Sequence, residues 1–268
     1  MSLVSEISEV IMWLNNNSGA IQAITTFILV IVTSIYVKLT KEMVDELKKE
    51  NKSRKIQDLV NCVINPIKNS AKSNLEKLEK GQYHYHHKTG EIFISKLEPS
   101  HSRSTADLDT LNRAFEEDYS EISEKIKKYN VLRDELEKAV DDLANSILTS
   151  PEFKERFFQM VDEYNKNVPD KKLTYTNLER YFESLIGEII DKTEKLSDRD
   201  NSAQFWEIYK EQLFGFLESE KIKEKTQKVE DIRFQLIDIL RIVIRKLERV
   251  EYRLWREYNI RIERREAV

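Results

Sequence analysis

Two long stretches of the chain place apolar residues at intervals of three and four, which is the period of one face of an α-helix. The first stretch covers 105–148 and the second covers about 223–264. The apolar positions of the first are Leu108, Leu111, Phe115, Tyr119, Ile122, Ile126, Tyr129, Leu132, Leu136, Val140, Leu143 and Ile147. Those of the second are Val229, Ile232, Leu236, Ile239, Val243, Leu247, Val250, Leu254 and Tyr258. We therefore predict two long, coiled-coil-like helices that pack along each other.

Shorter helical patterns lie between the two long stretches, at 151–166, 176–196 and 203–218. Ser150 and Pro151 suit the N-cap and the first position of a helix. Thr176, followed three residues later by Glu179, has the spacing of a capping box. Together these patterns predict a helical bundle domain over residues 105–268.

The composition supports an all-α fold. The chain of 268 residues has only 5 Gly and 4 Pro, whereas average usage would give about 19 and 13. Folds rich in β-sheet need these residues in their turns. The single cysteine, Cys62, excludes a disulfide within the chain, and its apolar neighbours predict that it is buried.

The N-terminal region holds a long segment without charge, from Val10 to Val37. Residues 19–39 have about the length that a helix needs to cross a bilayer, and Lys38 marks the end of the segment. We therefore predict an N-terminal single transmembrane helix at 19–39. The alternatives are a buried core helix and a cleaved signal peptide, but a signal peptide needs a basic start. This chain starts with the acidic residues Glu6 and Glu9.

Charge predicts the orientation of this helix. Lysines and arginines are frequent between residues 38 and 55, and none precedes the segment. The positive-inside rule then places the N-terminus outside and the C-terminal domain in the cytoplasm of a single-pass protein of the cell membrane, with the lipid bilayer as a partner. Residues 1–18 form an outer-face segment with a short amphipathic helix, and residues 40–80 form a helical juxtamembrane stalk.

The N-terminal residues Trp13, Asn17, Gly19, Ala20, Ile21, Gln22, Ala23 and Ile24 resemble the anchor of small, uncharacterised prokaryotic single-span membrane proteins. Some of those proteins lie near phage-defence functions. The resemblance is confined to this segment, and it implies a membrane anchor. It implies nothing about the rest of the chain, which resembles no family known to us.

Residues 81–104 differ from the helical regions, because they contain two glycines, one proline and every histidine of the chain. The pattern indicates a short β-hairpin near 83–95. The weak candidates for metal ligands are His84, His86, His87 and His101. On a strand, His84 and His86 would share a face and could bind one metal ion. The alternative, which we favour, is an exposed polar loop that binds no metal.

The C-terminal region is basic, since residues 241–265 hold nine lysines and arginines against four glutamates. Helical spacing gathers a basic face from Arg245, Arg249, Arg253 and Arg256. Such a face could bind nucleic acid or anionic lipid. The alternative is pairing with residues 105–148, where acids outnumber bases twelve to six. We favour helix pairing and do not expect nucleic acid as a partner.

Short catalytic motifs are absent from the sequence, including the phosphate-binding, dinucleotide-binding, nucleophile-elbow and zinc-protease patterns. We therefore predict no enzymatic activity and no cofactor. The expected function is that of a membrane-anchored helical scaffold or sensor that acts through protein–protein interaction or self-association, as a homo-oligomer. The alternatives are a membrane-bound effector of defence or stress and a metal-dependent enzyme centred on the histidines.

Overall fold

The computed structural model describes residues 3–83, 85–86, 88–100, 108–168, 173, 178–194, 196 and 202–258. These residues are mostly helical, and they contain no β-strand. The elements are α1 (Leu3–Asn16), α2 (Ser18–Leu59), the π-helix η1 (Val60–Ile64), α3 (Asn65–Glu79), α4 (Leu108–Asp118), α5 (Ser120–Thr149), α6 (Pro151–Asn167), α7 (Leu178–Ile190), α8 (Ser202–Phe214), the 3₁₀-helix η3 (Gly215–Glu218) and α9 (Lys223–Tyr258).

The chain divides into two compact units, Met1–Ile56 and Gln57–Val268. The first unit contains α1 and most of α2, and the second contains the helical bundle. The finer boundaries predicted at residues 18, 39, 80 and 104 stay predictions.

Helix α2 contains the predicted membrane span but continues to Leu59. In the part of the chain that the structure describes, no helix combines the length and the apolar character that crossing a membrane requires. The predicted transmembrane helix at 19–39 is therefore wrong, and so is the single-pass localisation derived from it. The physical reason is that a segment without charge can still carry polar groups, which lower its mean hydropathy. Thr26, Thr33 and Ser34 interrupt this one, and their hydroxyls donate to backbone carbonyls 2.7–2.8 Å away, four residues earlier.

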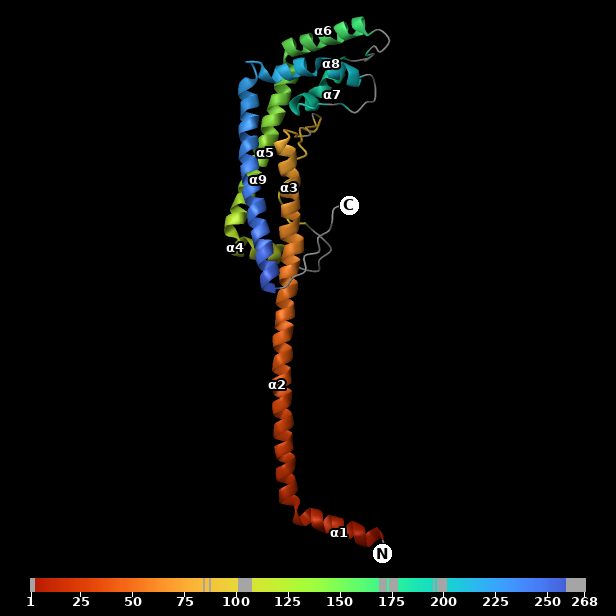
Figure 1. Cartoon of the computed structure of the whole chain (residues 1–268), viewed down its shortest axis with the longest axis vertical. Helices are drawn as coiled ribbons and strands as arrows, with labels where there is room; N and C mark the ends of the chain where they lie inside the picture. Colours follow the sequence, from red (N-terminus) through yellow and green to blue (C-terminus); the bar gives the residue numbers. More distant parts are fainter. Residues whose placement is uncertain are drawn as a thin grey trace. The chain divides into compact units, whose positions relative to one another are not determined.

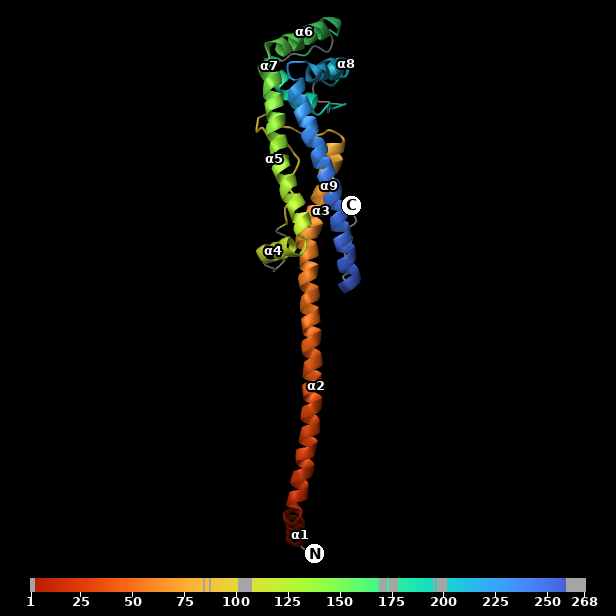
Figure 2. The same cartoon turned by 90° about the vertical axis from the view of Figure 1, so that its left-hand side faces the viewer.

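The predicted pairing of the two long helices is confirmed, because α5 packs along α9. Leu136 and Val140 of α5, and Leu240, Val243 and Leu247 of α9, are fully buried. Helix α3 packs on α9 as well, and Figures 1 and 2 show α3, α5 and α9 side by side. The core of the second unit is thus built around the two long helices α5 and α9 and the shorter α3.

The first long stripe is divided between two helices. Helix α4 ends at Asp118 and α5 begins at Ser120, because Tyr119 leaves the helical conformation with φ −130° and ψ 43°. The apolar spacing continues through this break, so the pattern predicts one helix where the structure has two. The predicted start of α6 is confirmed, since the Ser150 hydroxyl accepts a hydrogen bond from the Phe153 N–H at 3.4 Å.

Helices α6, α7 and α8 lie together at one end of the α5–α9 pair (Figure 1). Their core is aromatic: Phe157 contacts Phe182 at 4.9 Å between ring centroids, and Phe153 stacks on Phe216 at 4.6 Å. Trp206 is fully buried, and its indole N–H donates to the Thr193 carbonyl at 2.9 Å. These contacts bury most of the aromatic surface and satisfy the indole donor.

The helical path from η1 to α3 is shaped by Pro66. A proline has no N–H, so Pro66 cannot donate to the carbonyl of Cys62, four residues earlier. That carbonyl instead accepts a hydrogen bond from the Ser100 N–H at 3.0 Å, and the Asn65 N–H reaches back to Val60. Cys62 is buried, as predicted.

Gly187 in α7 lies against the backbone of residue 85, and a Cβ at this position would stand 2.6 Å from the Tyr85 carbonyl oxygen. We expect Gly187→Ala to lower the free energy of unfolding by up to about 2 kcal/mol. Overpacking costs about 1–3 kcal/mol, and the higher helix propensity of alanine offsets about 1 kcal/mol of that cost. Urea denaturation measures the change. The matched control is Gly215→Ala, where a Cβ meets nothing within 4 Å. Equal stability of the two variants would contradict the close approach.

Candidate functional site

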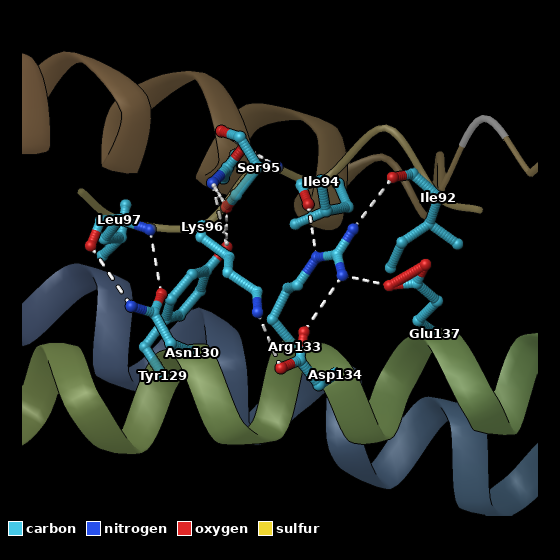
Figure 3. Close-up of polar contacts among 11 residues, drawn as sticks. Ile92, Ile94, Ser95, Lys96, Leu97, Tyr129, Asn130, Arg133, Asp134 and Glu137 are labelled. Atoms are coloured by element: carbon cyan, nitrogen blue, oxygen red, sulfur yellow. Dashed lines mark hydrogen bonds and ion pairs between the residues drawn. The ribbon is translucent and has the colours of Figure 1, made fainter. Parts of the chain in front are cut away.

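The segment 88–100 lies between α3 and α5, and side chains of these helices bind its backbone (Figure 3). The Arg133 guanidinium donates from Nε to the Ile94 carbonyl at 2.7 Å and from Nη2 to the Ile92 carbonyl at 3.3 Å. The Asn130 amide accepts from the Leu97 N–H at 2.9 Å and donates to the Leu97 carbonyl at 3.2 Å. Arg133 and Asn130 of α5 therefore hydrogen-bond to the backbone of the segment, as the backbone of a neighbouring β-strand would.

Asn74 of α3 holds the same segment from the other side. Its amide donates to the Ser95 carbonyl at 2.7 Å and to the Tyr129 hydroxyl at 2.9 Å, and it accepts from the Ser95 N–H at 3.2 Å. The residue is 1% exposed, so these bonds satisfy a buried amide. The contacts fix the segment between two core helices.

The predicted hairpin near 83–95 is wrong as a pair of strands. In the described part of this region the chain reverses through one isolated bridge, in which the His86 N–H donates to the Glu91 carbonyl at 2.9 Å. The Phe93 N–H also donates to the Tyr83 carbonyl at 3.0 Å. Beyond Phe93 the backbone groups bond to Asn74, Asn130 and Arg133, so they are not available to a second strand.

Only one of the four candidate metal ligands can be placed. His86 is exposed, and its Nδ1 lies 3.2 Å from the Thr89 hydroxyl. His84, His87 and His101 lie outside the described residues. Among the residues that are described, no three histidine, cysteine or carboxylate side chains come together as a metal site.

Two tyrosines beside the histidines anchor the region to α5 and to the end of α7. The Tyr85 hydroxyl donates to Asp141 at 2.7 Å, and the Tyr83 N–H donates to Asp191 at 2.8 Å. Burial is the main cause that raises the pKa of both phenols above its ordinary value. Both phenols therefore stay neutral at physiological pH, as suits structural anchors.

The four arginines of the predicted basic face do come together. Arg245, Arg249, Arg253 and Arg256 line an open groove of about 820 Å³ along α9. Its described lining also includes Glu248, Tyr252 and Glu257. We call this feature the α9 groove. It presents more positive than negative charge, so its chemistry suits anions.

Helix pairing does not use these arginines. Toward α5, the cations of α9 that form ion pairs are Lys246, with Glu121, and Lys225, with Asp142 at 3.8 Å. Among the described residues, no carboxylate forms an ion pair with Arg245, Arg249, Arg253 or Arg256. The expectation that pairing with the acidic helix would engage this face is wrong for these four residues.

Two glutamates of α9 beside the groove, Glu248 and Glu251, form ion pairs with lysines of α3. Lys72 binds Glu248 at 2.6 Å, and Lys68 binds Glu251. Each lysine of α3 thus occupies a carboxylate that lies one helical turn or less from a groove arginine. The packing of α3 on α9 therefore engages two carboxylates that could otherwise neutralise the guanidiniums, and Glu257 is left as the carboxylate of the described lining that α3 does not bind.

Sequence reasoning missed the aromatic part of this site. Tyr252 lines the groove and is 62% exposed, and Trp255 is 45% exposed with its ring centroid 6.5 Å from that of Tyr252. Both residues fall outside the buried stripe of Val250 and Leu254. The sequence did contain a signal for this: both aromatic residues lie off the apolar stripe of the helix, and an aromatic residue in such a position faces solvent.

The comparisons with known proteins gave no relative: no protein-family model, no curated protein and no solved structure matches the chain.

Proposed function

We propose that this protein is a helical scaffold that acts through self-association, with the stretch of α2 from Phe27 to Leu47 as the contact surface. The observation that carries the proposal is the exposed apolar surface of the first unit. Its large apolar side chains between Phe27 and Leu47 are 42–71% exposed. Contiguous apolar surface of this kind is a sign of an interaction site.

The spacing of these residues favours a second copy of the chain as the partner. Apolar side chains recur by threes and fours along α2, and we call this row the seam: Leu29, Val32, Tyr36, Leu39 and Met43. This is the a/d spacing of a coiled coil. A row of this kind is self-complementary, so identical copies can pair along it. Association would bring several copies of the bundle together, as expected of a scaffold.

The test is the size of the full chain, measured by sedimentation and light scattering in a mild non-ionic detergent that keeps apolar surfaces in solution. We expect a defined dimer or larger oligomer at micromolar concentration. The double variant Leu39→Lys, Met43→Lys is expected to shift the chain to a monomer, because two charges would be buried in each copy of the seam.

The matched control is Val37→Lys with Val44→Lys, two exposed apolar positions off the seam in the same stretch. It is expected to keep the oligomer. A monomeric wild-type chain would refute self-association, and equal dissociation of both double variants would refute the seam.

A further inference from the structure

The α9 groove carries a row of fixed positive charges that form no ion pair with the part of the chain that the structure describes. Arg245, Arg249, Arg253 and Arg256 follow one another over about 16 Å of helix, at 1.5 Å rise per residue. Each guanidinium is permanently charged and offers a planar fork of donors that matches a phosphate group. We propose that the α9 groove binds single-stranded nucleic acid, with the arginines on successive phosphates and Tyr252 stacked on a base.

The aromatic residues distinguish this ligand from a simple anion. Tyr252 lies within the row of arginines, 62% exposed, and Trp255 stands beside it. Proteins that bind single strands combine a positive groove with aromatic rings on which the bases stack. An acidic peptide would engage the arginines as well, but it would leave both exposed rings without a role.

The position of the arginines on α9 favours a single strand over a duplex. A recognition helix of the helix-turn-helix type contacts base edges in the major groove with its N-terminal residues, whereas the groove arginines lie near the C-terminal end of α9. Helix α9 is packed on α3 and α5, and it offers only its outer face. A flexible single strand can bring both phosphates and bases to that one face.

The test uses the full chain and a fluorescein-labelled oligothymidylate of twenty nucleotides, with binding measured by fluorescence anisotropy at several salt concentrations. We expect binding that weakens as salt rises. Four phosphate contacts predict a slope of log affinity against log salt of about −3, at about −0.7 per contact. A duplex of equal length is expected to bind at least about tenfold more weakly.

Two sets of variants locate the site. Arg249→Glu with Arg253→Glu should weaken binding by about tenfold or more and make the salt slope shallower. The matched control, Lys223→Glu with Lys228→Glu, makes the same change of net charge on exposed residues of α9 outside the groove, and it should leave binding nearly unchanged. Tyr252→Ala should weaken binding without changing the slope, and Tyr252→Phe should restore it, because the phenyl ring still stacks.

Several results would overturn the proposal. The first is failure of the wild-type chain to bind the oligonucleotide. The second is an equal loss of affinity in Arg249→Glu with Arg253→Glu and in the control Lys223→Glu with Lys228→Glu. The third is an unchanged affinity in Tyr252→Ala. Tighter binding of labelled polyglutamate than of oligothymidylate would show that the groove takes acidic protein instead. The substituted side chains are exposed, so circular dichroism should report the wild-type helix content in every variant.

Discussion

Replacing Leu136 or Leu247 by Asp is expected to unfold the second unit, Gln57–Val268. Leu136 lies on α5 and Leu247 on α9, and both side chains are fully buried. Truncating a buried leucine costs about 2–5 kcal/mol, and a buried carboxyl group without a partner adds several more. The sum is comparable with the entire stability of a typical domain, about 5–15 kcal/mol.

Circular dichroism and urea denaturation measure this effect. The matched control is Val131→Asp, on the same helix as Leu136 but 59% exposed, and it should change stability by less than about 0.5 kcal/mol. A folded Leu136→Asp variant with stability near that of the wild type would contradict the assignment of the core.

The long helices could be predicted because burial imposes its period directly on the sequence. The stripes of α5 and α9 are almost entirely large and apolar, and each has one buried face. Helix α3 was harder to recognise as a core helix, since its buried positions include the small Ala71 and the polar Asn74. A stripe of that composition looks like part of a solvated stalk until its partners are known.

The charge-free segment shows how a simple criterion fails. The sequence argument counted ionised residues between Val10 and Val37 and found none, but the hydroxyls and amides in this segment also reduce its hydropathy. Three of those hydroxyls donate hydrogen bonds to backbone carbonyls of the same helix. The surface that remains is apolar and exposed, and that is the property on which the proposed self-association depends.

The basic face was visible in the sequence, but its accessibility was not. Helical spacing alone aligns Arg245, Arg249 and Arg253. Whether Glu248 and Glu251 neutralise these arginines depends on where their side chains point, and both glutamates pair with lysines of α3, far away in the chain. Contacts of this kind arise from tertiary packing, so no local pattern could predict them.

The hairpin prediction failed for a similar reason, and the failure identifies Arg133 as a key residue. Its side chain is 13% exposed, and it binds two carbonyls of the segment 88–100 together with Glu137 and Asp134. We expect Arg133→Ala to lower the free energy of unfolding by about 2–4 kcal/mol. Each of its two hydrogen bonds to a carbonyl contributes about 1.5–3 kcal/mol, because the donor is charged. Water can hydrogen-bond to the freed carbonyls and so offset part of this loss. Urea denaturation measures the change.

Limited proteolysis separates this role from a general loss of stability. Cleavage within 88–100 should accelerate in Arg133→Ala well below the denaturation midpoint, because the carbonyls of Ile92 and Ile94 lose their donors. Arg133→Lys should recover only part of the protection, since an ammonium group lacks the planar fork that reaches both carbonyls. The control is Lys128→Ala, an exposed residue of the same helix. If Arg133→Ala were cleaved no faster than Lys128→Ala, the other contacts of the segment, such as those of Asn74 and Asn130, would be sufficient to hold it, and the proposed role of Arg133 would be wrong.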